Sequence, residues 1–200
     1  MNEVIKTIKN RRSIRSFSSE QIKEEELNAI IEAGIYAPSG QNNQPWYFTV
    51  IQDSKVIDHI NQVAKEVTRE IIEKKEKGWE LYKSFIERRK AAGLTDNFYI
   101  TYGAPTLIIV SGKKNSAKWK HTLCTCGAAI QNILLTAESL NIGSVWLDST
   151  NRCFSRVKEA EKIGIPEDYE ILYGIALGYK KQKKQPEAPE RNYNVINFIK

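Results

Sequence analysis

The sequence predicts one globular domain that mixes helices and strands around a common core and spans residues 1–200. Two hundred residues are enough to enclose a sizeable core. Hydrophobic residues make up 41% of the chain, an ordinary fraction for a folded protein. Some segments repeat apolar residues every three or four positions, as one-sided helices do. Others are short continuous apolar runs, as buried strands are.

Helical signals occur in six segments. In the second, Glu24, Glu25 and Glu26 occupy the first turn, where negative charge favours the N-terminal helix dipole. The fifth is the longest and is apolar on most sides. We therefore expect it to be buried on most sides, in part against a second subunit. The expected helices cover 1–10, 23–36, 57–71, 79–93, 117–140 and 152–163.

Strand signals occur in four segments, which cover 47–52, 106–110, 144–148 and 171–179. The region 53–102, between the first two strands, is predicted to be a helical excursion that carries Trp79, Tyr82 and Phe85. Such an excursion can form a lid over a substrate site, or it can be an amphipathic helix pair packed on the core. The sequence leaves both interpretations open.

The loop from Ala37 to Trp46 joins the second helix to the first strand and contains no charged residue. Pro38 should end the helix near Ala37, and Gly40 should allow a tight turn. The Gln and Asn side chains of this loop both donate and accept hydrogen bonds, so the loop suits a flat, neutral ligand rich in heteroatoms. An ordinary polar connection is the alternative interpretation.

Three arginines and a serine lie within five positions, from Arg11 to Arg15, directly after the first helix. Guanidinium groups bind phosphate oxygens in pairs, so this cluster is typical of a phosphate site. One basic residue could instead stabilise the C-terminal dipole of the helix, but three with an interleaved Ser13 exceed that need. Together with the amide-rich loop, the cluster indicates a planar heterocycle that carries a phosphate.

Several other classes of function lack their motifs. The sequence contains no glycine-rich dinucleotide motif, no nucleotide-triphosphate loop, no Gly-x-Ser-x-Gly elbow and no convincing Cys–His pair. Residue sets for nucleophilic or acid–base catalysis are therefore missing, which leaves the chemistry to a cofactor. We expect no catalytic side chain and no metal site, because His59 and His121 are isolated.

Charge and cysteine content favour a cytoplasmic protein with small-molecule ligands. The net charge is +6, but the lysines are scattered among glutamates and only Lys180–Lys184 forms a dense basic run, so we expect no nucleic-acid partner. No segment is predicted to span a membrane, and the N-terminus lacks the pattern of a signal peptide. Cys124 and Cys126 lie two apart on a predicted helix and face different sides, which suits reduced thiols.

Five motifs resemble the FMN-dependent nitroreductase family, and they occur in the family's order. They are Arg-Arg-Ser-Ile-Arg-Ser-Phe at 11–17, Ala-Pro-Ser-Gly-x-Asn-x-Gln-Pro-Trp at 37–46, Gly-Ala-Pro at 103–105, and the segments 128–135 and 142–146. The likeness runs from residue 5 to about residue 178, with a looser middle.

The resemblance implies a fold and an assembly. The fold is α+β with three layers, in which a central, mostly antiparallel sheet is flanked by helices. Two copies form an intertwined homodimer with two FMN sites at the interface. Residues 180–200 form a C-terminal extension onto the partner subunit.

The resemblance also implies how FMN is bound without a covalent link. Arg11 and Ser13 hold the phosphate with Arg12 beside them, and Arg191 is the candidate for a second phosphate cation. Arg15 reaches the pyrimidine edge of the ring. The loop approaches the flavin from the other subunit, and the end of the third strand faces the ring. These last residues are Pro38, Ser39, Gly40, Asn42 and Gln44 of the loop and Leu147, Asp148 and Ser149 of the strand end.

The activity implied is NAD(P)H-dependent reduction of an electron-poor acceptor such as a nitroaromatic or a quinone. NAD(P)H and the acceptor use one site in turn, which is a ping-pong mechanism. One alternative is another reaction on the same fold, namely reductive dehalogenation, enone reduction or flavin fragmentation. The other is a flavin-binding protein without catalysis. The sequence does not distinguish NADH from NADPH.

Overall fold

The computed structural model of the protein describes residues 1–91, 100–114, 119–148, 163–182 and 186–200. Its helices are α1 (Glu3–Asn10), α2 (Glu24–Ile35), the short 3-10 helix η1 (Gly40–Asn42), α3 (Ser54–Glu73), α4 (Trp79–Ala91) and α5 (Trp119–Ser139). Its strands are β1 (Trp46–Ile51), β2 (Thr106–Lys113), β3 (Ile142–Leu147) and β4 (Tyr169–Tyr179). The helix predicted at 152–163 lies outside the described residues.

The strands form a sheet of order β1-β2-β4-β3 in which each neighbouring pair is antiparallel. β2 is an inner strand of this sheet, and its side chains pack into the core on both faces. Leu107 and Ile109 belong to one core cluster, and Ile108 and Val110 belong to the other. A strand covered on both faces needs a continuous apolar run, which is the pattern of its sequence. The predicted antiparallel sheet is confirmed.

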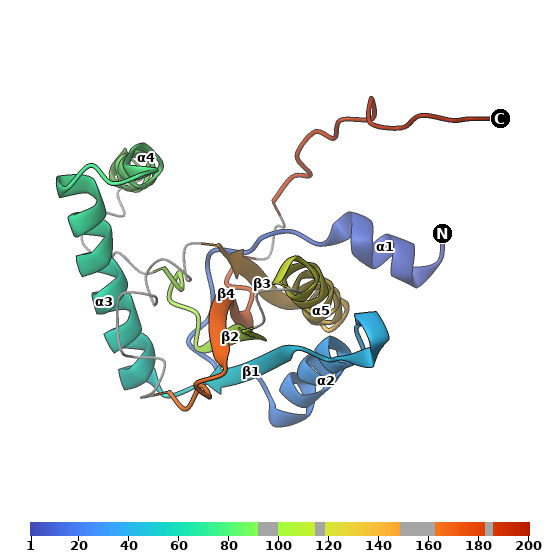
Figure 1. The fold of residues 1–200 in the computed structure, drawn as a ribbon, viewed down its shortest axis with the longest axis horizontal. Coiled ribbons are helices and arrows are strands. Elements are labelled where there is room, and N and C mark those ends of the chain that lie inside the picture. The colour runs from blue at the N-terminus through green and yellow to red at the C-terminus, as the bar shows by residue number, and fades with distance from the viewer. Residues whose placement is uncertain (92–99, 115–118, 149–162, 183–185) are drawn as a thin grey trace.

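Helices cover both faces of the sheet, which gives three layers (Figure 1). α2 and α5 pack on one face, where Ile30 and Ile130 are fully buried with Ile108 of the sheet. α3 packs on the other face through Ile57 and Ile60. The α+β architecture predicted from the sequence is therefore confirmed.

α5 has buried and exposed thiols on different sides. Cys126 is fully buried among apolar neighbours, and burial raises the pKa of its thiol to about 12. Cys124, two residues earlier, is exposed. Both thiols are free. Because one is buried and the other exposed, the expectation that the two cysteines face different sides is confirmed.

The loop after α2 differs from its prediction at one glycine. α2 ends at Ile35, close to the end expected from Pro38. However, the left-handed backbone conformations fall at Gln41 (φ 56°), Asn42 (φ 55°) and Gln44 (φ 42°), whereas Gly40 does not have positive φ. The expectation that Gly40 supplies the conformational freedom of the turn was wrong. Asn adopts this conformation more readily than most residues, and hydrogen bonds from Gln44 to Ser39 and Asn42 hold the loop in place.

Two parts of the chain project from the layers. α4 packs against α3 and stands away from the sheet at the upper left of Figure 1, and the segment 186–200 extends away at the upper right. Apolar side chains are exposed in this terminal segment, including Phe198 at 76% and Ile199 at 94%. None of the described helices has the length and apolar character needed to cross a membrane.

Candidate functional site

The arginine segment, defined as residues 11–17, is held against the sheet by backbone contacts. Ser13 forms a parallel bridge with Ser144 of β3, and the Ile14 amide donates to the Ser144 carbonyl at 2.9 Å. Further along, Phe17 forms an antiparallel bridge with Lys180, directly after β4. The polar side chains of this segment are therefore fixed to the rigid end of the molecule that β3 and β4 form.

Two glycines make room for the apolar side chains of the arginine segment. Gly143 and Gly178 lie opposite each other on β3 and β4. A Cβ on Gly143 would lie 2.9 Å from Cγ2 of Ile14, and a Cβ on Gly178 would lie 3.2 Å from Cδ1 of Phe17 and 2.7 Å from Cδ of Pro105. Because both sites lack a Cβ, Ile14 and Phe17 can pack deeply, and they are each only 7% exposed.

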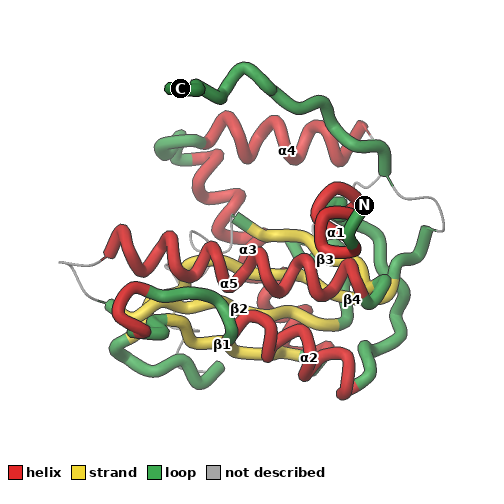
Figure 2. The backbone as a smooth tube through the Cα atoms, turned by 90° about the vertical axis from the view of Figure 1, so that its right-hand side faces the viewer, coloured by secondary structure: helices red, strands yellow, loops and turns green. Residues whose placement is uncertain are grey.

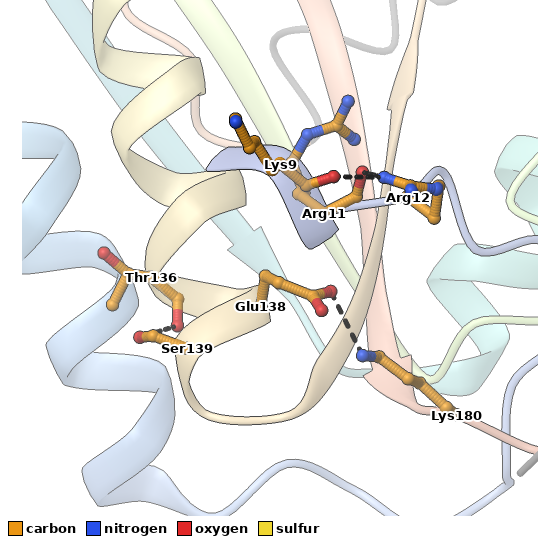
Figure 3. A network of polar contacts seen from close by, with 7 residues as sticks. All are labelled: Lys9, Arg11, Arg12, Thr136, Glu138, Ser139 and Lys180. Atoms are coloured by element: carbon orange, nitrogen blue, oxygen red, sulfur yellow. Dashed lines mark hydrogen bonds and ion pairs between the residues drawn. The ribbon is translucent and has the colours of Figure 1, made fainter. Parts of the chain in front are cut away.

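Arg11 lies in a cluster of charges near the C-terminal end of α5 (Figure 3). Partial burial lowers the pKa of Arg11 and the Glu138 carboxylate opposes that shift, while the guanidinium groups of Arg12 and Arg191 add to it. An arginine remains charged at physiological pH, so the lowered pKa reports mainly that the Arg11 guanidinium is partly buried, with smaller contributions from the cations of Arg12 and Arg191. A bound phosphate would relieve the repulsion among them.

Arg12 is the basic residue that stabilises the C-terminal end of α1, a role that the sequence analysis expected one basic residue to fill. Its Nη1 donates to the carbonyl of Lys9 at 2.7 Å and to the carbonyl of Arg11 at 2.8 Å, which caps the end of α1 (Figure 3). Its Nε is buried and has no hydrogen-bond partner in the structure. Arg12 therefore closes the helix and still presents one buried donor beside Arg11.

The cluster continues through a shielded ion pair. Lys180 Nζ lies 3.1 Å from Oε2 of Glu138, and the side chains are only 14% and 10% exposed. Figure 3 shows this pair below Arg11 and Arg12, at the end of α5. Lys180 begins the dense basic run noted in the sequence, but in the structure its ammonium group is paired and largely buried.

Arg15 and the end of β3 were both predicted to contact the flavin ring, and their surroundings differ. Arg15 is exposed, and its guanidinium carbon lies 5.8 Å from the centre of the Tyr102 ring. Leu147 ends β3 and is 4% exposed, whereas the next residue, Asp148, is exposed. Ser149 lies outside the described residues.

The loop 38–44 is braced by its own polar groups. The Gln44 amide donates to Ser39 Oγ at 3.1 Å, and Gln44 Nε2 donates to Asn42 Oδ1 at 3.1 Å. The Asn43 side-chain amide donates to the Gly40 carbonyl at 2.7 Å. Side chains that were expected to face a ligand thus also hold the loop. Its left-handed residues are a form of backbone strain that is common in ligand-binding loops.

A cleft of about 520 Å³ lies beside this loop. Pro45 just before β1, the end of β2 and the first turns of α5 complete its walls. Of its lining residues, only Gly40 was among the predicted site residues. Lys113 and His121 were missed because no motif or spacing connects them in the sequence. The lining consists of Gly40, Gln41, Asn43, Pro45, Lys113, His121, Thr122 and Thr125.

The loop and the arginine cluster lie at opposite ends of α5. The loop shares its cleft with His121, and Arg11 interacts with Glu138. Seventeen residues of helix separate these two positions, which corresponds to about 25 Å. Figure 2 shows α5 along the sheet with α1 at its far end. One small ligand cannot contact both regions of a single chain.

The charges around Arg11 fit the phosphate of a flavin nucleotide. Arginine donors, a buried unpaired Nε and the neighbouring Ser13 form a donor set for an anion. These donors stand on backbone that the sheet fixes, so a bound phosphate would need little reorganisation.

Known proteins show the same fold and sequence pattern. The profile of the nitroreductase family matches residues 8–179. A protein of Archaeoglobus fulgidus, provisionally named NADH dehydrogenase/NAD(P)H nitroreductase, is 31% identical over 97% of this chain and 95% of its own length. The NADPH-flavin oxidoreductase of Vibrio harveyi is 29% identical over 99% of this chain and 78% of its own length. The chain therefore belongs to the nitroreductase family.

A solved structure supports the same assignment of the fold. The crystal structure of a Bacteroides fragilis nitroreductase with bound FMN matches with a TM-score of 0.82 and 29% identity, and it covers 100% of both chains. The three-layer α+β arrangement described above is thus the nitroreductase fold.

Proposed function

We propose that this member of the nitroreductase family is an FMN-dependent oxidoreductase that uses NAD(P)H to reduce electron-poor acceptors. The observation that carries this proposal is the buried, unpartnered Nε of Arg12 beside Arg11, on a segment that the sheet fixes, because these groups offer charged donors to the FMN phosphate. The names of its relatives, a flavin oxidoreductase that uses NADPH and a nitroreductase with FMN bound, support it.

The residues of the chain bind and orient the cofactor. Arg11 and Ser13 hold the phosphate, Arg191 adds a second cation, and Arg15 reaches the pyrimidine edge. The backbone at Asp148, which is an exposed residue, faces the ring. FMN supplies the redox chemistry, because it takes two electrons from a nicotinamide and gives them to an acceptor. For a nitro group the balanced reaction is NAD(P)H + H⁺ + R–NO₂ → NAD(P)⁺ + R–NO + H₂O.

The proposal includes a homodimer in which the site is shared. Because the loop 38–44 and Arg11 lie about 25 Å apart along α5, the loop that reaches the ring belongs to the second copy. Pro38, Ser39, Gly40 and Asn42 approach the ring from there. The apolar face of α1 is exposed, with Val4 at 62%, and so is the apolar C-terminal segment. Both surfaces are suited to a second copy of the chain.

NAD(P)H and the acceptor use the same position in turn, so the kinetic mechanism is ping-pong. Within the helical excursion, α4 covers this position as a lid, since it stands away from the sheet, whereas α3 packs on the core (Figure 1). The proposed compartment is the cytoplasm, because Cys124 and Cys126 are free thiols.

A single preparation tests the function. Purified protein reconstituted with FMN should show bound-flavin absorbance, and anaerobic NADH or NADPH should bleach it. Addition of a nitroaromatic or a quinone should restore the absorbance with stoichiometric product. Protein that retains no FMN, or FMN that neither nicotinamide bleaches, would contradict the proposal. Bleaching without any acceptor turnover would favour a flavin-binding protein that lacks this activity.

A further inference from the structure

The cleft beside the loop 40–45 is lined by a cationic group and neutral hydrogen-bonding groups, to which the proposed function assigns no role. Its volume of about 520 Å³ lies within the range of small-molecule sites, which is about 300–1,000 Å³. Lys113 brings an ammonium group, and His121, Thr122 and Thr125 bring ring nitrogens and hydroxyls. Among the described residues that line the cleft there is no carboxylate. A lining of cation and neutral donors favours an anionic ligand.

The ammonium group of Lys113 is available to such a ligand. Its Nζ lies 3.7 Å from Oδ2 of Asp168, but the two side chains are 59% and 58% exposed. Solvent screens ion pairs that are this exposed, so they hold their partners weakly. Lys113 can therefore turn from Asp168 to a bound anion at little cost.

The next residue offers a natural comparison. Lys114 Nζ donates to the Glu167 carbonyl at 2.8 Å, and Lys114 does not line the cleft. Lys113 and Lys114 are neighbours of equal charge at the end of β2, but only Lys113 lines the cleft. Substituting each lysine in turn therefore distinguishes a direct contact between Lys113 and the ligand from a general effect of the protein's net charge.

The cleft also has an uncharged wall suited to a ring. Pro45 contributes an apolar surface, and a Cβ added to Gly40 would meet no atom within 4 Å, so the space beside Gly40 is open. Gln41 and Asn43 add amide groups at the edge. A flat aromatic body with one anionic substituent matches this arrangement.

We propose that this cleft selects acceptors that are aromatic carboxylates, with Lys113 binding the carboxylate and His121 and Thr125 donating hydrogen bonds. The inference rests on the proposed function, in which the loop that contains Gly40 reaches the flavin of the partner subunit. A ligand in the cleft then lies beside that flavin with its anionic group directed toward Lys113.

The test compares isosteric acceptors with the FMN-loaded dimer. 4-Nitrobenzoate and 4-nitrobenzamide differ mainly in charge. In the unaltered protein kcat/KM should favour the benzoate. Lys113→Met should lower kcat/KM for 4-nitrobenzoate about tenfold, as expected for loss of one charge-assisted hydrogen bond. The value for 4-nitrobenzamide should stay within about twofold. Lys114→Met should leave the ratio of the two values unchanged.

Binding of benzoate, which carries no reducible group, gives a second readout. Calorimetric titration of the FMN-loaded protein should show benzoate binding that weakens with added salt and is lost in Lys113→Met but kept in Lys114→Met. Thermal unfolding of both variants should match the unaltered protein, because both side chains lie at the strand end and Lys113 is exposed.

The outcomes separate the two proposals. Equal use of 4-nitrobenzoate and 4-nitrobenzamide, or a parallel loss for both in Lys113→Met, overturns the selectivity and leaves the oxidoreductase function intact. A higher KM for NADPH but not for NADH in Lys113→Met also overturns it, since the lysine then binds the donor's phosphate. Lys113-dependent benzoate binding without turnover of any acceptor supports the cleft and overturns the oxidoreductase function.

Discussion

Lys180 and Glu138 join the end of β4 to the last turn of α5 through an ion pair of 3.1 Å. With side chains only 14% and 10% exposed, this pair is shielded from solvent, and the Glu138 carboxylate also favours the charged form of Arg11. The pair therefore balances part of the positive charge that the arginine cluster gathers. It also ties the last turn of α5 to Lys180, the residue with which Phe17 of the arginine segment forms its backbone bridge.

Removal of Glu138 should be costly to the fold. Glu138→Gln leaves the Lys180 ammonium group shielded without its counter-charge, and we expect a loss of about 2 kcal/mol in the free energy of unfolding, below the value for fully buried pairs. Denaturant unfolding of FMN-free protein measures this loss.

Glu70 provides the control, because it also lies 3.1 Å from its lysine, Lys74, but with side chains 51% and 64% exposed. Glu70→Gln should change the free energy by less than about 0.5 kcal/mol. Equal losses in the two variants would show that shielding is unimportant.

Substitution of Arg11 should weaken FMN binding. Arg11→Ala removes a charged hydrogen-bond donor from the phosphate, and the dissociation constant should rise by a factor that corresponds to more than about 1.5 kcal/mol. Arg12→Ala should raise it less, because Arg12 already donates to the carbonyls of Lys9 and Arg11. Fluorescence titration with FMN measures both, and riboflavin, which lacks the phosphate, should bind the Arg11 variant and the unaltered protein equally. Tight, unchanged FMN binding in Arg11→Ala would exclude the phosphate assignment.

A methyl group at position 143 should displace the arginine segment. In Gly143→Ala the new Cβ lies 2.9 Å from Ile14 Cγ2, so Ile14 must move, and overpacking of this kind costs about 1–3 kcal/mol. We expect lower stability and weaker FMN binding together. Gly127→Ala in α5 is the control, since its Cβ meets only Trp146 at 3.8 Å and alanine favours a helix. Weaker FMN binding without a loss of stability would argue against this packing.

Loss of the C-terminal segment should affect assembly and cofactor content. Deletion of residues 185–200 removes the exposed apolar side chains Val195, Ile196 and Phe198 and also removes Arg191. We expect a lower melting temperature and less bound flavin, and sedimentation should show a weaker dimer. Arg191→Ala in the full chain should reduce flavin content but leave the dimer intact. A monodisperse, FMN-loaded monomer would rule out the shared site.

The kinetics should show no titrating catalytic side chain. Double-reciprocal plots should be parallel, with competition between NAD(P)H and acceptor at high concentrations, and the rate of anaerobic flavin bleaching should change little across neutral pH. His59→Ala and His121→Ala should leave that rate nearly unaltered at full FMN occupancy, although His121 lines the cleft. Intersecting lines that require a ternary complex, or a large loss in either histidine variant, would contradict this mechanism.

Local patterns predicted the elements of the fold well. The continuous apolar run of β2 reports a strand covered on both faces, and the period of α3 reports its single buried face. The conformation of the loop after α2 was predicted less well, because Gln41 and Asn42 adopt left-handed conformations whereas the neighbouring Gly40 does not. Hydrogen bonds within the loop stabilise these conformations, and such bonds depend on the folded geometry.

The candidate site was predictable only where its residues are close in sequence. The arginine segment stands out as a cluster, whereas Lys113 and His121 come from different elements and meet only in the fold. The partner of Lys180 was hidden for the same reason. Glu138 lies 42 residues away in sequence, and no local pattern relates the two.

The packing of Ile14 and Phe17 against Gly143 and Gly178 constrains when the protein can acquire its cofactor during synthesis. The arginine segment leaves the ribosome early, but β3 and β4, which seat it, follow more than 120 residues later. The nascent chain must therefore expose both strands before the arginine segment can take its place. Chains released before β4 should then fail to hold this segment and should bind FMN poorly.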